Sequence, residues 1–414
     1  MNNNKMMKVA IITGGGLPVP NVKGGAVEAL VTMLGNENSE ENLLEFTIFS
    51  VEDAEAIETT KREKNAHTHY VFINIPKIIR FFDICSYWIA KNLLHKHDLM
   101  SYKFFFQRIF FNHKVAKICM QNDYDRLIFE NSLLPMRMLR RKGNSKYISR
   151  SFLHMHNIIT HTFGMEKIVP KIAGVLTVSD YIAQKICESV PELDSSKVTV
   201  LRNCIDAKMF NMESKEVISK AEAFRKKLNI PKQSIIFLFT GRLTEEKGAK
   251  QLLQAFKRIN FNNAYLVIAG SYFFNSKIKS SFELELQSLA KELQEHVKFT
   301  GFINYEDMPS VYAMSDVCVL PSIWDDPAPL AVIESIVSGT PLITTYSGGI
   351  PEYVNGKTAI ILERNDDLVN ELAKNMRLIA ESTEVRKKMS REALKLGKQY
   401  NAKSYLANFV KCIK

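Results

Sequence analysis

The chain alternates between short apolar runs and longer stretches whose apolar residues recur with the helical period of about 3.6 residues. Such alternation is typical of parallel sheets with helices on both faces. In these sheets, ligands bind beyond the carboxyl ends of the strands. The apolar runs predict strands at residues 7–13, 44–50, 69–74, 127–129, 146–157 (where the strand continues into a loop), 173–179, 198–203, 234–240, 264–269, 297–302 and 316–320.

The helical stretches and one polar segment indicate how the chain divides. With 414 residues, the chain is long enough for two domains, each with its own core. Residues 211–231 are polar and rich in Lys and Glu, which is typical of a hinge. We therefore expect an N-terminal domain at 1–210, a second domain at 211–398 and a returning C-terminal helix at 399–414. The main helices are predicted at residues 24–34, 250–259, 287–293, 329–339, 364–397 and 400–413.

Composition narrows the class of protein. Apolar residues make up 46% of the chain and charged residues 24%, as in ordinary soluble globular proteins. The six cysteines form no C-x-x-C pair, which argues against a zinc site and for reduced thiols. The sequence shows no signal-peptide pattern and no apolar run of about 18 residues. We therefore expect a cytoplasmic protein without a membrane span.

The positive charge is concentrated in one region. The formal net charge is +11, and residues 77–150 carry 15 Lys and Arg against 5 Asp and Glu. Aromatic residues are interleaved with these cations, a combination that suits an anionic membrane surface. Nucleic acid is the weaker alternative because no recognised motif accompanies the charge. Helices with buried aromatics and solvated basic faces remain the third interpretation.

Residues 321–341 carry the most specific chemistry. An apolar run ends at Leu320, prolines hold an extended loop, and a helix is predicted to begin near Pro329 and to stop at Gly339. Asp326 lies in the loop and Glu334 lies on the helix. A helix N-terminus suits an anion, and a carboxylate can accept hydrogen bonds from hydroxyls. The stretch therefore predicts a pocket for a ligand such as a nucleotide sugar, with an ordinary strand–loop–helix bearing two surface acids as the alternative.

This stretch resembles the E-x7-E signature of the family-4 retaining glycosyltransferases (glycosyl transferases group 1), with Asp326 in place of the first Glu. The resemblance covers the C-terminal half almost throughout and the N-terminal half more thinly. It implies the α/β GT-B fold, in which two Rossmann-like, doubly wound parallel-sheet domains face a cleft and the C-terminal helix returns to the first domain. Further pieces match in order at residues 203–210, 239–248, 266–271, 297–302 and 347–352.

The N-terminal half offers three groups of candidate residues. Gly14–Gly16 do not form a G-x-G-x-x-G motif, so a nicotinamide-binding domain is disfavoured. Gly24 and Gly25 precede a helix, where backbone N–H groups can approach an anion; the resemblance implies contact with the donor phosphate or the acceptor, and a plain tight turn is the alternative. Asp123-Tyr-Asp125 has the D-x-D pattern of metal sites but precedes an apolar run, so we interpret it as the entry to a strand.

Two histidines follow at the end of the run at 146–157. Period two places His154 and His156 on one face while the strand lasts. Two histidines without further ligands do not make a zinc site. The resemblance implies a histidine close to the anomeric carbon of the donor, and the pair His156-Asn157 fits that position better than His154 does. Which of the two faces the donor is left open.

In the C-terminal half, Arg242 and Lys247 follow a predicted strand. Two fixed cations suit a diphosphate leaving group that no metal neutralises. The resemblance implies that Glu334 holds the ribose hydroxyls and that backbone groups of Phe302 and Ile303 hold the base. The implied catalytic residues are His156, Arg242, Lys247 and Asp326, with no metal. The implied donor-binding residues are Gly24, Gly25, Arg242, Lys247, Phe302, Ile303, Ala328, Leu330 and Glu334.

The resemblance therefore implies a hexosyltransferase that moves a sugar from a nucleoside-diphosphate sugar, either a UDP-sugar or a GDP-sugar, to an acceptor hydroxyl with retention. No separate cofactor is expected. A saccharide or lipid-linked saccharide of surface polysaccharide synthesis is the expected acceptor, with contact to the inner face of the cell membrane through residues 77–150. Because Asp326 is one methylene shorter than Glu, a non-catalytic protein that binds a nucleotide sugar or a partner is the alternative. A phosphorylase is a third interpretation.

Overall fold

The computed structural model describes residues 6–62, 67–94, 100–259, 263–271 and 280–414. The chain divides into two compact units. Unit 1 comprises Met1–Arg202 and Tyr405–Lys414, and unit 2 comprises Asn203–Ser404. The units thus divide after Arg202, whereas the sequence analysis set the boundary after residue 210.

Unit 1 is built on a seven-stranded sheet in the order β3-β2-β1-β4-β5-β6-β7. Every neighbouring pair is parallel. The central strands are buried and largely apolar because helices cover both faces, as in doubly wound sheets, and their polar residues lie mostly at the strand ends. The strands are β1 (Lys8–Ile12), β2 (Glu45–Val51), β3 (Thr68–Ile73), β4 (Arg126–Glu130), β5 (Ser151–Met155), β6 (Gly174–Thr177) and β7 (Val198–Val200).

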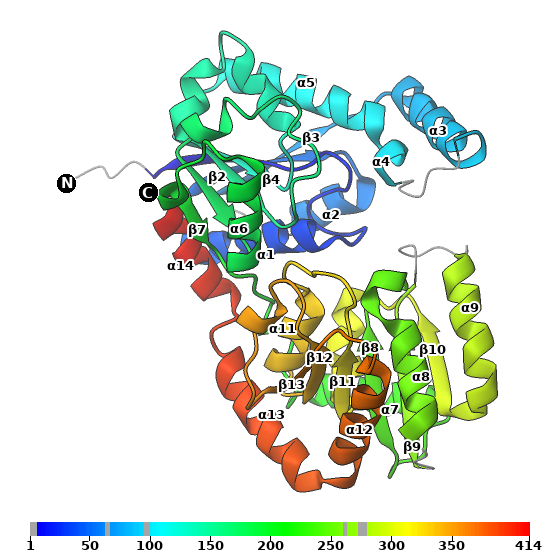
Figure 1. The fold of residues 1–414 in the computed structure, drawn as a ribbon. Helices are drawn as coiled ribbons and strands as arrows, with labels where there is room; N and C mark the ends of the chain where they lie inside the picture. Colours follow the sequence, from blue (N-terminus) through cyan, green and yellow to red (C-terminus); the bar gives the residue numbers. More distant parts are fainter. Residues whose placement is uncertain (1–5, 63–66, 95–99, 260–262, 272–279) are drawn as a thin grey trace. The chain divides into compact units, whose positions relative to one another are not determined.

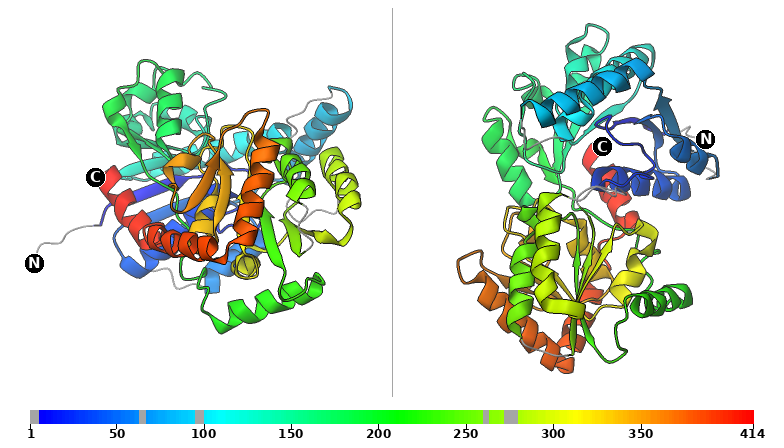
Figure 2. Two further views of the ribbon diagram at one scale, coloured as in Figure 1. Left: turned by 60° about the horizontal axis from the view of Figure 1, so that its bottom comes forward. Right: turned by 90° about the vertical axis from the view of Figure 1, so that its right-hand side faces the viewer.

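The helices of unit 1 lie on both sides of this sheet. Figures 1 and 2 show the helices α1 and α5 on opposite faces. Helix α3 packs on α5 and leaves much of its own surface exposed. The helices are α1 (Ala26–Glu41), α2 (Ala54–Arg62), α3 (Lys77–Asn92), α4 (Met100–Lys103), α5 (Phe105–Gln121) and α6 (Asp180–Ser189).

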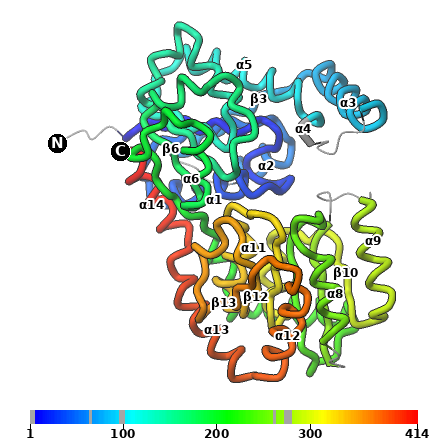
Figure 3. Tube along the Cα trace, viewed as in Figure 1, coloured from blue at the N-terminus to red at the C-terminus, as the bar shows by residue number. Residues whose placement is uncertain are grey.

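The last helix, α14 (Ala402–Ile413), joins unit 1 through its residues from Tyr405 onward (Figure 3). Phe409 on α14 meets Phe46 on β2 edge to face, with ring centroids 6.1 Å apart. Arg126 donates a hydrogen bond from Nε to the carbonyl oxygen of Ile413 at 2.7 Å. Apolar packing and a charge-assisted hydrogen bond therefore hold the end of the chain on unit 1.

Unit 2 contains a six-stranded sheet in the order β10-β9-β8-β11-β12-β13. All of its neighbouring strands are also parallel. The two sheets confirm the predicted α/β class with two doubly wound parallel-sheet domains. The strands are β8 (Ile235–Thr240), β9 (Ala264–Ala269), β10 (Val297–Gly301), β11 (Val317–Leu320), β12 (Leu342–Thr345) and β13 (Ala359–Leu362).

The helices of unit 2 pack in pairs, of which α7 with α10 is one. Helix α8 packs on α12, and α11 packs on α13. Ser382 separates α12 from α13 and caps the second of them, since its side chain accepts a hydrogen bond from the backbone N–H of Val385. The helices are α7 (Lys215–Lys227), α8 (Ala249–Ile259), α9 (Ser281–Ala290), α10 (Met308–Ala313), α11 (Leu330–Val337), α12 (Leu368–Glu381) and α13 (Thr383–Gly397).

Each sheet has one switch point, where the order in which successive strands are added to the sheet reverses. In unit 1 the strands run outward from β1 on one side and from β4 on the other, and in unit 2 the corresponding pair is β8 and β11. Doubly wound sheets bind ligands beyond the carboxyl ends of the strands at such a switch point. These two places are therefore where functional side chains are expected.

Three predicted elements differ in extent: the helix predicted at 364–397 is two helices separated by Ser382, the helix predicted at 287–293 lies at Ser281–Ala290, and the strand predicted at 146–157 is shorter. Residues 145–150 form a 3₁₀ turn, and the strand predicted at 146–157 runs only from Ser151 to Met155. The reason is Tyr147, which is fully buried and donates its hydroxyl toward the carbonyl oxygens of Cys119 and Asn122, at 3.1 and 2.6 Å. Its ring packs in the core although the residue lies in a turn. The alternation of apolar and polar residues in the sequence does not distinguish such a turn from a strand.

None of the helices in the described part of the chain is long and apolar enough to cross a bilayer.

Candidate functional site

In unit 1, a buried carboxylate meets both predicted histidines. Glu130 is the last residue of β4, and His154 lies opposite it on β5 in register. The Oε2 atom of Glu130 lies 3.1 Å from Nδ1 of His154 and 3.0 Å from Nε2 of His156. The two rings stand 4.2 Å apart, centroid to centroid. The structure thus brings His154 and His156 together on one carboxylate that the sequence analysis missed.

The protonation of this group follows from its contacts. Burial alone would raise the pKa of Glu130, but the charges and hydrogen bonds of the two histidines hold it at about 2. Burial lowers the pKa of His156 to about 4, helped by His154 and opposed by Glu130. Glu130 is therefore an ionised hydrogen-bond acceptor at neutral pH, and His156 is an uncharged imidazole.

Among the described residues, Glu130, His154 and His156 also form a possible metal site, because their ligand atoms lie within 4.8 Å of one another. The sequence analysis set the histidines aside as a zinc site because no further ligand was visible, and it predicted no metal. Glu130 supplies a third possible ligand. In the structure, however, its carboxylate already accepts a hydrogen bond from each ring.

A second acid lies at the glycine turn before α1. Gly24 and Gly25 have φ angles of 79° and 103°, which glycine adopts readily. A Cβ atom on Gly25 would come within 2.2 Å of a carboxylate oxygen of Glu28, so this acid lies directly over the turn. Burial raises the pKa of Glu28 to about 7, and the charge of Arg108 partly opposes this. A ligand at this turn, which was predicted to be the donor phosphate or the acceptor, would therefore meet an acid that titrates near neutral pH.

Helix α5 holds the neighbouring loop after β1. The side-chain amide of Gln107 donates to the carbonyl oxygens of Gly15 and Gly16, at 2.9 and 3.0 Å. Asp83 of α3 in turn accepts the backbone N–H groups of Phe106 and Gln107 at the start of α5. The loop beyond β1 is therefore fixed by contacts from α5, and α5 is capped by α3.

In unit 2, Arg242 and Lys247 follow β8 as predicted. Arg242 is exposed and forms no ion pair in the part of the chain that the structure describes. Lys247 ends a short 3₁₀ turn, and Gly248 follows it with a φ of 73°. A Cβ atom on Gly248 would lie 1.9 Å from the carbonyl oxygen of Pro321, so glycine is required for the close approach of this turn to the β11 loop.

Lys247, which is half-buried, forms an ion pair with the buried Asp326. The pair joins Nζ to Oδ2, and the Asp326 side chain is 7% exposed. The backbone of Asp326 is also fixed, because its carbonyl oxygen accepts the N–H of Gly349 at 2.8 Å and its N–H donates to the hydroxyl of Ser347 at 3.3 Å. The two predicted catalytic residues thus meet, and the loop at residues 347–349 holds the acid in place.

Glu334 is buried and contacts a tyrosine that the sequence analysis missed. The hydroxyl of Tyr312 on α10 lies 2.9 Å from Oε2 of Glu334, and it also lies 3.1 Å from Oγ1 of Thr240 at the end of β8. Burial raises the pKa of Glu334 to about 7, and the hydrogen bond from Tyr312 partly opposes the shift. Tyr312 therefore connects the acid on α11 to the carboxyl end of β8.

The remaining predicted donor contacts lie on loops at the same edge of the unit 2 sheet. Phe302 is exposed and Ile303 half-buried, directly after β10. Ala328 is buried, and its carbonyl oxygen accepts the side-chain amide of Asn203 at 3.1 Å. Leu330 begins α11, with Pro329 as the residue before it. The carbonyl oxygen of Ala328 is thus already bonded within unit 2.

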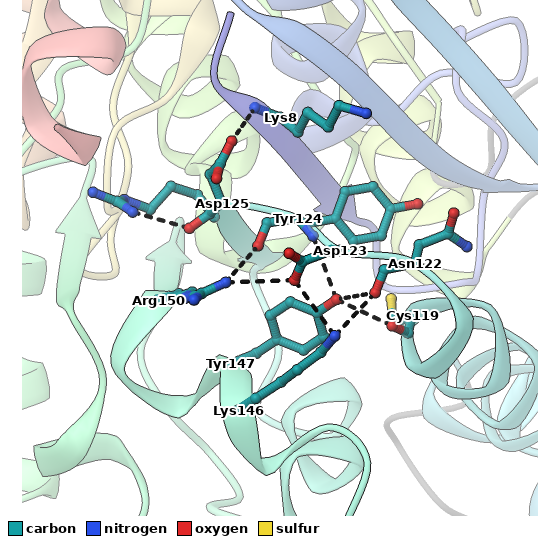
Figure 4. Close-up of polar contacts among 10 residues, drawn as sticks. Lys8, Cys119, Asn122, Asp123, Tyr124, Asp125, Lys146, Tyr147 and Arg150 are labelled. Carbon is teal, nitrogen blue, oxygen red and sulfur yellow. Dashed lines mark hydrogen bonds and ion pairs between the residues drawn. The ribbon is translucent and has the colours of Figure 1, made fainter. Parts of the chain in front are cut away.

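The D-x-D segment takes a structural role. Asp123 pairs with Lys146 and Arg150, at 3.4 and 3.5 Å, and Asp125 accepts the backbone N–H of Lys8 at 2.8 Å (Figure 4). Both acids precede β4, so they lie at the amino end of the strand, whereas Glu130 lies at its carboxyl end. Their partners are cations and backbone of unit 1, which supports the interpretation as a strand entry.

The family model for glycosyl transferases group 1 matches residues 220–396. Over 397 residues the chain is 28% identical to the putative glycosyltransferase YtcC of Bacillus subtilis, covering 94% of this chain and 87% of that protein. It is also 24% identical over 254 residues to the lipopolysaccharide 1,2-N-acetylglucosaminetransferase of Salmonella typhimurium, covering 59% and 62%.

Similarity in structure extends over both units. The crystal structure of Anabaena Alr3699/HepE in complex with UDP-glucose superposes with a TM-score of 0.71 at 15% identity, covering 98% of this chain and 99% of that one. At this identity the comparison shows the fold alone, which is that of the GT-B glycosyltransferases. Over residues 220–396, the chain is therefore similar to the glycosyl transferases of group 1.

Proposed function

We propose that this protein transfers a hexosyl group from a nucleoside-diphosphate sugar to an acceptor hydroxyl, with retention of the anomeric configuration and without a metal ion. In this reaction the bond from the anomeric carbon to the diphosphate oxygen breaks, a bond to the acceptor oxygen forms, and the acceptor hydroxyl loses its proton. The observation that carries the proposal is the meeting of Lys247 with Asp326 at the switch point of unit 2, where β8 and β11 adjoin.

The leaving group requires positive charge. Diphosphate gains negative charge as its bond to the sugar breaks, and fixed cations stabilise that charge. Arg242 is exposed at the end of β8 and can bind two oxygens at once. Lys247 supplies a second charge, and Asp326 fixes the position of its ammonium group. Arg242 and Lys247 would therefore take the place of a metal ion.

The nucleoside would be held by the acid on α11 and by the loop after β10. Glu334 would accept hydrogen bonds from the ribose hydroxyls, and backbone groups of Phe302 and Ile303 would hold a uracil or guanine base. Ala328 and Leu330 would line the phosphate subsite through their backbone N–H groups. In unit 1, His156 would contact the donor sugar, and the turn at Gly24 and Gly25 would contact the phosphate or the acceptor.

The acceptor would be a saccharide or lipid-linked saccharide in the synthesis of surface polysaccharide. Similarity to the Salmonella lipopolysaccharide enzyme supports this class of acceptor. A second support is the apolar surface of α3 and α5. Its exposed members, here called the α3–α5 surface, are Ile78, Phe81, Phe82, Ile84, Trp88, Ile89, Leu93, Leu94, Phe105, Phe106 and Ile109.

The charge around the α3–α5 surface suits an anionic bilayer, because its exposed charged neighbours are basic: Lys77, Arg80, Lys91, Lys103 and Lys114. The one acid among the described residues of this stretch, Asp83, is buried under the start of α5. Apolar side chains flanked by cations bind membrane interfaces that carry anionic lipid. The protein would therefore work at the cytoplasmic face of the membrane.

The central experiment incubates the purified protein with a panel of UDP- and GDP-sugars and measures release of the nucleoside diphosphate with and without candidate acceptors, in the presence of EDTA. Release with one donor, dependent on acceptor and insensitive to EDTA, is the expected result. Donor binding without any release would instead identify the non-catalytic alternative, which the replacement of Glu by Asp326 raises. Turnover that requires inorganic phosphate and no nucleotide would identify a phosphorylase.

A further inference from the structure

The geometry around Glu130 points to a positioning role: we propose that this carboxylate fixes one tautomer of His156, with the proton on Nε2, so that Nδ1 presents a lone pair to a substrate hydroxyl. Nothing in the sequence patterns pointed to Glu130. The proposal rests on the proposed glycosyl transfer only for the identity of that hydroxyl, since the tautomer itself is a property of the unliganded protein.

The first step of the argument is the direction of two hydrogen bonds. A carboxylate accepts hydrogen bonds and donates none. Nδ1 of His154 is hydrogen-bonded to Oε1 of Glu130 at 3.3 Å, and Nε2 of His156 is hydrogen-bonded to Oε2 at 3.0 Å, so both rings must donate to the carboxylate. His156 therefore carries a proton on Nε2, and His154 carries one on Nδ1.

The second step is the other nitrogen of His154. Its Nε2 atom is buried and has no hydrogen-bond partner among the described residues. A proton there would be a buried donor without an acceptor, which is costly. A single proton on Nδ1 avoids this, and that proton is directed at Glu130. The arrangement of His154 thus agrees with an ionised Glu130 rather than a protonated one.

The third step is the backbone that presents His156. Its N–H donates to the side chain of Asn131 at 3.1 Å, and Asn131 itself adopts a left-handed φ of 52° directly after Glu130. Asparagine tolerates this conformation better than most residues do. Glu130 thus holds the ring of His156, and Asn131, the residue after Glu130, holds its backbone.

These contacts decide what His156 can recognise. In an imidazole that is uncharged and donates through Nε2, the Nδ1 atom is an acceptor only. Such an atom can bind a sugar or acceptor hydroxyl but cannot bind a phosphate oxygen, which has no proton to donate. His156 therefore serves as a contact for a hydroxyl, and the charge of the diphosphate is left to other groups.

The direct test is the tautomer of the two histidines in the unmodified protein. After labelling with ¹⁵N-histidine, NMR correlation spectra of the nine histidine rings distinguish the protonated nitrogen from the bare one, and the variants His154→Asn and His156→Asn assign the signals. We expect a bare Nδ1 in His156 and a bare Nε2 in His154. A bare Nε2 in His156 would overturn the proposal without reference to activity.

The variant Glu130→Gln then changes the hydrogen-bond pattern with little change in shape. A Gln side chain accepts at its oxygen and donates at its nitrogen, so one of the two rings must present a lone pair where it presented a proton. We expect one histidine to change tautomer. The control Asp83→Asn alters a buried acid of unit 1 whose partners are backbone N–H groups, and it should leave the histidine signals unchanged.

Kinetics separate positioning from simple structural support. Glu130→Gln is expected to lower kcat by about 10- to 100-fold with a smaller change in the KM of the donor, as loss of a group that orients a contact residue does. Adding Glu130→Gln to His156→Ala should cause no further loss, because the oriented ring is gone. Independent losses that multiply would count against positioning.

A metal ion is the outcome that would replace this interpretation. If elemental analysis of the purified protein found one equivalent of zinc or another divalent ion, and Glu130→Gln lost it, the ring nitrogens would be ligands rather than donors to Glu130. The expected result is no stoichiometric metal in either protein and no shift of the histidine signals on adding zinc chloride at one equivalent.

Discussion

Two buried carboxylates, Glu130 in unit 1 and Glu334 in unit 2, stand in corresponding places and have opposite acidities. Glu130 is the last residue of β4, and Glu334 lies on α11, the helix that follows β11. In each sheet, β4 or β11 is one of the two strands at the switch point. The pKa of Glu130 is lowered to about 2, whereas the pKa of Glu334 is raised to about 7. Both are nearly inaccessible, so burial alone does not decide the sign.

The difference lies in the partners. Glu130 meets two imidazoles that can carry positive charge, while Glu334 meets the hydroxyl of Tyr312, which remains neutral. Burial raises the pKa of a carboxylate, and only charged or strongly donating neighbours reverse it. An acid that is ionised at neutral pH is suited to orienting histidines. An acid that titrates near neutrality is suited to binding hydroxyls from a ligand that also brings negative charge.

The largest effect is expected where unit 2 faces the diphosphate. Arg242→Ala should lower kcat by at least about 100-fold, because one cation that stabilises the leaving group is lost. Initial rates of nucleotide release with the identified donor measure it. The control is Arg258→Ala, an arginine on α8 whose guanidinium contacts the side chain of Asn370.

Near-normal turnover in Arg242→Ala would contradict the assignment of the leaving-group site. It would leave the comparison of the two acids intact, because Arg242 contacts neither of them in the described structure. A loss of similar size in Arg258→Ala would show that any removal of charge from unit 2 disturbs the enzyme.

A smaller effect is expected at the nucleoside. Glu334→Gln keeps an oxygen that can accept the hydrogen bond from Tyr312 but removes the negative charge. Hydrogen bonds to a charged group contribute about 1.5–3 kcal/mol, so affinity for the nucleoside diphosphate should fall by about 10- to 100-fold. Calorimetric titration with UDP and GDP at pH 8 measures this.

The comparison predicts a matched control for that experiment. Glu130→Gln should leave the affinity for the nucleoside diphosphate within a few-fold of the unmodified protein, because its proposed role concerns a hydroxyl contact of His156. An equal loss in both variants would remove the distinction between an orienting acid and a ligand-binding acid.

Local sequence was enough to predict the fold class and the residues of unit 2 that lie within motifs. Arg242 and Lys247 are five residues apart, and Asp326 and Glu334 eight residues apart, so turn and helix signals placed them directly. The meeting of Lys247 with Asp326 could not be predicted in the same way, because it joins turns 79 residues apart across β8 and β11.

The buried acids Glu130 and Glu334 and their partners show where sequence patterns are insufficient. Glu130 is 24 residues before His154, and only the parallel register of β4 and β5 brings them together. In unit 2, Tyr312 is likewise 22 residues before Glu334, and no local pattern in the sequence links the two. The strand predicted at 146–157 was too long because a buried tyrosine in a turn has the same local pattern as one in a strand.

The most direct test of the comparison is the dependence of stability on pH. The pKa of Glu334 is about 7 in the folded protein against 4.5 for a free side chain, so its contribution is full below pH 4.5 and is lost as the pH rises toward 7. The pKa of Glu130 is about 2, so its contribution is full above pH 4.5 and is lost as the pH falls toward 2.

The two Gln variants should therefore shift stability in opposite directions. Thermal unfolding of the full chain at pH 5, 6, 7 and 8 measures both. Glu334→Gln should gain stability relative to the unmodified protein as the pH rises, by up to about 3 kcal/mol for a shift of this size. Glu130→Gln should lose stability throughout this range, because the charged acceptor of two histidines is gone. Parallel pH profiles for the two variants would mean that both acids have the same charge in the folded protein, and this result would contradict the comparison.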